Sequence, residues 1–155
     1  MHIEDFPMSE LGTSMKQVLA NTFMMYMMAH KYHFNVEGRN FQQYHDMFKT
    51  IYDELWLSVD VIAENIRGLD EYVPFNCARL QELSDIEDDN RIPTASGMMD
   101  KLLAANQKVM DSLNTSVEKA RIAGNGGVEN MLTARLETHA KHGWFLRATA
   151  KTNRE

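Results

Sequence analysis

The feature that most constrains the fold is a run of apolar residues that recurs every three or four positions between residues 41 and 69. The run consists of Phe41, Tyr44, Phe48, Ile51, Leu55, Val59, Ile62, Ile66 and Leu69. Because an α-helix turns once in about 3.6 residues, this spacing places the side chains on one face of a helix. The segment therefore predicts a single amphipathic helix about 43 Å long, at about 1.5 Å per residue.

Three other segments share this period and predict three more long helices. The first covers about 9–35, the second starts after Thr94, and the third covers about 128–153. Residues 70–94 break the pattern, although 76–84 has the composition of a short helix that begins at an Asn cap. The alternation of apolar and polar residues that indicates strands is absent. We therefore expect an all-α chain in which two helical hairpins are joined by one long crossover, the ferritin-like form of the four-helix bundle.

Length, charge and cysteine content limit the cellular location that we expect for the protein and the classes of partner that it could bind. A chain of 155 residues with a formal charge of -6 suits one domain, residues 1–155, and disfavours a general nucleic-acid binder. The longest apolar stretch, residues 23–29, is too short to cross a bilayer, and the acidic N-terminal segment does not resemble an export signal. Cys77 is the only cysteine, which predicts no disulfide within the chain and a reducing, cytoplasmic location.

The candidate chemistry lies beside the apolar stripe of the second helix. His45 is one position from the stripe, and Asp60 and Glu64 are spaced i and i+4 on what we expect to be its apolar side. His33, near the end of the first helix, could approach His45 across the hairpin. Buried imidazoles and carboxylates need a partner, and a metal ion is a natural one. The competing interpretation of the carboxylate pair is an ordinary solvated helix face.

The spacing decides how such a metal could be bound. His45 and Asp60 are 15 positions apart on one helix, which corresponds to about 22 Å at about 1.5 Å per residue. One metal centre cannot use both from the same chain, so a shared metal requires two subunits whose long helices run antiparallel. A di-iron site within one bundle would need Glu-x-x-His motifs, and the sequence contains none.

At this point the sequence resembles the Dps proteins, the mini-ferritins of the ferritin-like superfamily. The matching segments, which span nearly the whole chain in order, are His30–Gly38, Asn40-Phe41, His45, Asp60–Glu64, Leu80–Ile86 and Trp144–Leu146. The resemblance implies a homo-dodecameric hollow shell built from antiparallel dimers. It also implies iron binding, oxidation of Fe(II) with hydrogen peroxide at inter-subunit sites, storage of the iron and protection against oxidative damage.

Carried onto this chain, the family pattern makes His33 and His45 the ligands from one subunit, and Asp60 and Glu64 the ligands from its partner. The family's third ligand from the first subunit is an Asp, and here that position holds Lys49. An ammonium cannot ligate iron and repels cations.

Two interpretations of Lys49 stay open: it weakens the site, or it forms an exposed pair with Asp53 at i+4. The alternative function is accordingly a slow iron store or structural cage whose ferroxidase site is impaired or holds one metal.

Several other residues are expected to be structural. His30, His139 and His142 are expected to be ordinary core or surface histidines, Trp144 a core residue, and 85–89 a solvated acidic loop. DNA compaction is the third functional class, and the lysine-free, acidic segment 1–15 disfavours it. The basic residues that could still support it are Lys141, Arg147, Lys151 and Arg154.

Overall fold

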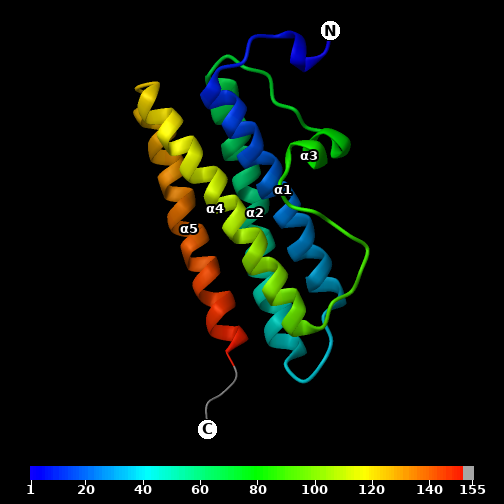
Figure 1. Cartoon of the computed structure of the whole chain (residues 1–155). Helices are drawn as coiled ribbons and strands as arrows, with labels where there is room; N and C mark the ends of the chain where they lie inside the picture. The colour runs from blue at the N-terminus through cyan, green and yellow to red at the C-terminus, as the bar shows by residue number, and fades with distance from the viewer. Residues whose placement is uncertain (152–155) are drawn as a thin grey trace.

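A computed structural model describes residues 1–151, and every regular element among them is helical (Figure 1). The four long helices are α1 (Glu10–Asn35), α2 (Phe41–Gly68), α4 (Ala95–Ile122) and α5 (Gly126–Ala150). A short helix, α3 (Cys77–Leu83), lies in the crossover, and one 3-10 turn, η1 (Ile3–Asp5), precedes α1. The expected all-α bundle with a helix-bearing crossover is confirmed.

The long helices form two antiparallel hairpins, α1 with α2 and α4 with α5, and α1 packs against α4 (Figure 1). The crossover leaves the end of α2 near the N-terminus of the chain and returns along the outside of the bundle to the opposite end. As a result α2 and α4 run in the same direction, as the ferritin-like connection requires. None of the described helices is both long and apolar enough to span a lipid bilayer.

Side-chain caps set the starts of four helices, because a helix leaves its first N–H groups without partners. Ser9, Asn76, Thr94 and Asn125 each accept a hydrogen bond from the backbone N–H three residues later. Asn125 moves the start of α5 two residues ahead of the expected Val128, since Gly126 and Gly127 join its first turn. The expected end at Asn153 lies outside the described residues.

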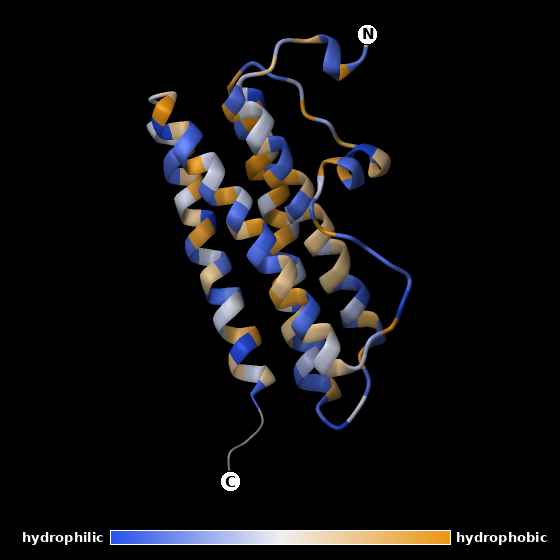
Figure 2. Ribbon diagram, in the orientation of Figure 1, coloured by the Kyte–Doolittle hydropathy of each residue, from blue (hydrophilic) through white to orange (hydrophobic). Residues whose placement is uncertain are grey.

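The apolar stripe of α2 forms a large part of the core. Phe48, Leu55, Ile62 and Ile66 are completely buried, whereas Phe41 at the start of the helix is 44% exposed. Hydrophobic and hydrophilic residues alternate along every long helix (Figure 2). The hairpin turn between α1 and α2 contains Gly38 at φ +120°, a conformation that residues with a Cβ rarely adopt.

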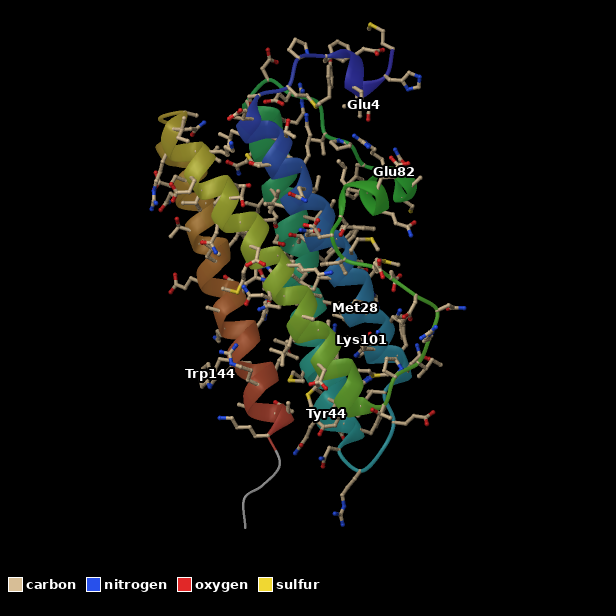
Figure 3. The ribbon with its side chains drawn as sticks, viewed as in Figure 1. Glu4, Met28, Tyr44, Glu82, Lys101 and Trp144 are labelled. Carbon is tan, nitrogen blue, oxygen red and sulfur yellow. The ribbon has the colours of Figure 1, made fainter. Side chains whose placement is uncertain are left out.

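The expectation that Trp144 lies in the core is wrong. Its side chain is 59% exposed on the outside of α5 (Figure 3). The buried face of α5 passes through Leu132, His139 and Leu146 at seven-residue intervals. Trp144 precedes Leu146 by two residues, about 200° around the helix, so it must point away from the core. With Phe145 it lines a cavity of about 810 Å³ between α2 and α5.

The acidic part of the crossover is anchored to the bundle and is not simply a solvated loop. Asp85 accepts hydrogen bonds from Gln17 and Asn21 of α1, and Asp88 forms an ion pair of 2.7 Å with Lys31. These contacts attach the crossover to α1 along much of its length. The loop is therefore part of the packed structure that holds the bundle together.

The start of the crossover is attached by a buried ion pair. The Lys16 ammonium lies 3.3 Å from the Glu71 carboxylate, and both side chains are nearly inaccessible to solvent. The Ser9 hydroxyl donates to the same carboxylate at 2.6 Å. Glu71 thus lies over the first turn of α1, where Gly12 leaves room that a Cβ would fill. A carboxylate at the positive end of a helix is favourable.

Candidate metal centre

His33 and His45 are brought together by the α1–α2 hairpin. His33 lies in the last turn of α1 and His45 near the start of α2. Their rings stack with centroids 3.7 Å apart and planes at 18°. His33 is buried, with 8% of its surface exposed, and His45 is half-buried. The expectation that the two side chains approach each other is confirmed.

The hydrogen bonds of the pair determine which ring nitrogens are available. His33 Nδ1 lies 2.8 Å from the carbonyl oxygen of His45, and His45 Nδ1 lies 2.7 Å from the carbonyl oxygen of His33. A carbonyl oxygen can only accept, so each Nδ1 must carry the proton and donate. Each neutral ring therefore keeps its lone pair on Nε2. Metal-binding histidines commonly have this arrangement, since the Nδ1–H bond fixes both tautomer and orientation.

Asp60 and Glu64 do not lie on the face of α2 that the bundle buries, and that expectation is wrong for the single chain. Both carboxylates are exposed, while Val59 and Ile62 turn inward. The reason is rotational, because Asp60 follows Val59 by one position, about 100° around the helix. The residues form the solvated face that the competing interpretation describes, as long as no second subunit covers them.

The surface around these carboxylates is unusually apolar. Trp56, Leu57 and Val61 on α2 are 51%, 71% and 46% exposed, and Phe75 of the crossover is 52% exposed. A hollow of about 490 Å³ beside Asp60 is lined by Trp56, Leu57 and Phe75 among others. Contiguous exposed apolar residues commonly mark a surface that another protein covers.

Within residues 1–151 no three His, Cys, Asp or Glu side chains of one chain are grouped so that they could hold a metal ion. The His33–His45 pair supplies two nitrogens, and the next expected ligand, Asp60, is about 22 Å farther along α2 at about 1.5 Å per residue. The single chain therefore contains two separate half-sites.

Lys49 forms the exposed pair with Asp53 in the single chain. Its ammonium is 2.8 Å from the Asp53 carboxylate, and both side chains are about half exposed, at 53% and 52%. The hydrogen bond to Asp53 is the largest contribution that raises the pKa of Lys49. The ammonium also lies 5.2 Å from the centre of the Tyr52 ring, which is itself 5.1 Å from the ring of His33. A positive charge therefore lies near the histidine half-site.

The family model of the ferritin-like domain matches residues 14–154. The chain belongs to the ferritin-like family. Among curated relatives, DNA protection during starvation protein 2 of Bacillus anthracis is 26% identical, over 86% of this chain and 90% of its own length.

Two solved structures have the same fold. Dps from Thermosynechococcus elongatus superposes with a TM-score of 0.89 at 24% identity, covering 97% of this chain and 94% of that one. Dps from Vibrio cholerae, described as a member of a superfamily of ferritin-like diiron-carboxylate proteins, gives 0.88 at 24% identity, with coverage of 92% and 89%. The resemblance to Dps proteins is confirmed.

In this ferritin-like chain the middle of the bundle contains a polar cluster that sequence reasoning missed. Arg135 of α5 donates to both carboxylate oxygens of Glu54 on α2, at 2.5 and 2.9 Å, and His142 donates to the same carboxylate at 2.9 Å. Burial raises the pKa of Glu54, but the hydrogen bonds from His142 and Arg135 outweigh it and lower the pKa to about 2. The carboxylate is therefore neutralised by a guanidinium, a role that a metal ion fills in bundles with an intrachain di-iron site.

His139 completes this cluster and is a core histidine, as expected. It is fully buried, and its Nδ1 donates to the side-chain oxygen of Asn106 at 2.8 Å. The Asn106 amide donates to the His139 carbonyl, which fixes its orientation, and Arg135 donates to Nε2 at 3.2 Å. Burial, followed by the charge of Arg135, lowers the pKa of His139 to about 3. The only sequence signal was the i, i+4 spacing of Arg135 and His139 on the inner side of α5.

Proposed function

We propose that this protein is a Dps-type mini-ferritin that binds Fe(II), oxidises it with hydrogen peroxide and stores the iron in a hollow homo-dodecameric shell. In this proposal the oxidation takes place between subunits. His33 and His45 of one subunit and Asp60 and Glu64 of the partner subunit bind the iron. Consuming peroxide and Fe(II) together would protect the cell against oxidative damage. The proposal treats residues 1–155 as one ferritin-like domain in a reducing cytoplasm, where the exposed Cys77 stays unpaired.

The observation that carries the proposal is the reciprocal hydrogen bonding of His33 and His45. Each backbone carbonyl accepts the Nδ1 proton of the other ring, so both Nε2 lone pairs are free to bind a metal. Two imidazoles suit a borderline cation, and two carboxylates supply the negative charge that Fe(II) and Fe(III) need. Each half alone offers too few ligands, which accounts for a requirement for two subunits.

The apolar surface around Asp60 and Glu64 supports a second copy of the chain as the partner. A two-fold axis across α2 would bury Trp56, Leu57 and Val61 against the partner's equivalent residues. With the α2 helices antiparallel, the same axis would bring each carboxylate pair towards the partner's histidine pair. Light scattering at low micromolar concentration should then report a particle near twelve subunits, and a stable monomer would contradict both the shell and the site.

Subunit mixing tests the inter-subunit site directly. One variant combines His33→Ala with His45→Ala, and the other combines Asp60→Ala with Glu64→Ala. Each cage alone should oxidise Fe(II) no faster than protein-free solution. In mixed cages every heterodimer regains one intact site, so random assembly should recover about a quarter of the wild-type rate. If the ligands all came from one chain, mixing would recover nothing.

The alternative candidate function is a slow iron store with one metal per site, and the position of Lys49 favours it. The ammonium is one helical turn from His45 and lies over the Tyr52 ring. Such a charge would oppose the second cation of a di-iron pair. Counting iron per subunit in anaerobic protein distinguishes the two candidates: two irons per site support the full ferroxidase, and one supports the slow store.

DNA binding is proposed to be weak and electrostatic. The sequence carries a net charge of -6 and has no lysine in residues 1–15. Lys141, Arg147 and Lys151 are exposed on and just after α5, and Arg154 lies outside the described residues. A few separated basic residues give little affinity for duplex DNA at physiological salt.

A further inference from the structure

The cavity of about 810 Å³ between α2 and α5 lies where the bundle is packed least closely. The long helices pack as α1 with α2, α1 with α4, and α4 with α5, whereas side chains bridge α2 to α5. Glu54 binds Arg135 and His142 at one bridge, and the Thr149 hydroxyl is 3.5 Å from Met47 Sδ at another. The two bridging residues of α2 are seven positions apart, which is about 10 Å at about 1.5 Å per residue. The space between the bridges therefore suits a slender molecule of about that length.

The walls of this cavity are mainly apolar. Ile51 is buried and Met47 is half-buried on the α2 side. On the α5 side the rings of Trp144 and Phe145 have centroids 4.8 Å apart and are 59% and 38% exposed. Small-molecule sites are concave, mostly apolar and about 300–1,000 Å³ in volume, with a few polar groups that fix orientation. The cavity between α2 and α5 has these properties within a single chain.

The charges around the cavity favour a cation. Apart from the histidine that binds Glu54, the charged side chains that line it are Asp46, Glu54, Glu137 and Lys141. A guanidinium already neutralises Glu54, whereas neither Asp46 nor Glu137 forms an ion pair within residues 1–151. The Lys141 ammonium lies 5.6 Å from the centre of the Phe145 ring, so an aromatic wall of the cavity already attracts a positive charge. Two unpaired carboxylates against one ammonium leave the rim negative.

We propose that this cavity binds a monovalent organic cation with an apolar body, of the arylalkyl-ammonium class. The ammonium group pairs with Asp46, and the body lies against Met47 and Trp144. Asp46 is the partner rather than Glu137, because Glu137 is four positions from the Lys141 ammonium on the same helix face. The site lies within one subunit and requires no iron, so it is independent of the proposed ferroxidase function.

The test is equilibrium dialysis of the assembled protein at physiological salt against three probes that share one apolar body. These are phenylbutylammonium, the neutral phenylbutanol and the anionic phenylbutyrate. The ammonium should bind at one molecule per subunit. It should bind about fivefold more tightly than the alcohol, which is the upper end of what an exposed ion pair contributes. The anion should bind most weakly, because it meets the same carboxylates.

Two variants locate the bound cation. Asp46→Asn should weaken binding of the ammonium about fivefold and leave binding of the alcohol unchanged. Asp53→Asn is the matched control, because it removes the same charge from the same helix but from a carboxylate that pairs with Lys49 outside the cavity. Trp144→Ala should weaken binding of all three probes. Light scattering establishes that each variant keeps the particle size of wild type.

Several results would overturn this inference. Equal binding of the ammonium and the alcohol, or equal effects of Asp46→Asn and Asp53→Asn, would show that Asp46 does not select a cation. Unchanged binding in Trp144→Ala would place the probes elsewhere, and no binding to the assembled protein would show that the cavity is not a ligand site. If Trp144→Ala does not assemble, the comparison of Asp46→Asn with Asp53→Asn still decides. None of these results bears on iron oxidation.

Discussion

Acid should weaken the bundle through one buried histidine, His139. Its Nδ1 proton is given to Asn106, and its Nε2 accepts from Arg135, so a second ring proton would face a guanidinium. Burial and that charge lower its pKa from 6.5 to about 3. The unfolded chain therefore binds a proton below pH 6.5 that the folded chain does not bind. The contribution of neutral His139 to the free energy of unfolding is fully present above pH 6.5, and it decreases as the pH drops towards 3.

The size of the effect follows from the two pKa values. Each pH unit within this window removes about 1.4 kcal/mol, because the two states differ by one proton. Between pH 7.5 and pH 5 the loss attributable to His139 is about 2 kcal/mol. Glu54 adds nothing over that range, since its pKa of about 2 matters only below the ordinary value of 4.5. Its contribution is lost between pH 4.5 and about 2.

Denaturant unfolding of wild type and His139→Gln, at fixed subunit concentration and at several pH values, measures this effect. Glutamine can replace both hydrogen bonds and does not titrate, so the variant should lose about 2 kcal/mol less than wild type between pH 7.5 and pH 5. The slope of the free energy of unfolding against pH is compared between the two proteins, and a loss of packing that is the same at every pH does not change this slope. Equal slopes for the two proteins would refute the assignment of this proton to His139.

Three further predictions concern the site, the surface and the packing. Lys49→Asp should speed Fe(II) oxidation and add a second bound metal, and both effects should disappear when Glu64→Ala is added. Stopped-flow rates and iron counts per subunit measure these effects. If Lys49→Asp leaves both unchanged from wild type, Lys49 is only a surface residue. In a gel shift at about 150 mM salt the assembled particle should leave duplex DNA unshifted, and a sequence-independent shift would show that the surface has been misread. Gly12→Ala should lower the free energy of unfolding by about 1–3 kcal/mol, because its Cβ would overlap the Glu71 carboxylate. Gly68→Ala is the control with no atom within 4 Å of the new Cβ, and an equal loss in both would contradict the overlap.

Much of the fold could be predicted because its signals are local. The apolar period of 41–69 and the cap residues Asn76 and Thr94 depend only on neighbours in the sequence, and the helices begin where those caps are. The prediction for Trp144 is wrong because its large aromatic side chain favours burial, whereas its angle around α5 turns it outward. The start of α5 was misplaced because two glycines after Asn125 look like a loop, although the cap makes them helical.

The candidate site could be predicted only in part, for reasons of distance. His33 and His45 flank a short hairpin, so their approach follows from the turn between them. Helix spacing separates Asp60 and Glu64 from the histidines, but the exposure of the two carboxylates depends on a rotation of about 100° that the apolar stripe alone leaves open. The Glu54–Arg135 pair joins residues 81 positions apart on two helices, and no local pattern indicates such a contact.

The central claim is that the iron site is shared between two subunits. The most direct measurement is the anomalous diffraction of crystals soaked in Fe(II) under anaerobic conditions. We expect an iron peak between His33 and His45 of one subunit and Asp60 and Glu64 of the partner subunit. Iron bound with ligands from one chain alone, or a dimer interface that stays empty at saturating Fe(II), would contradict it.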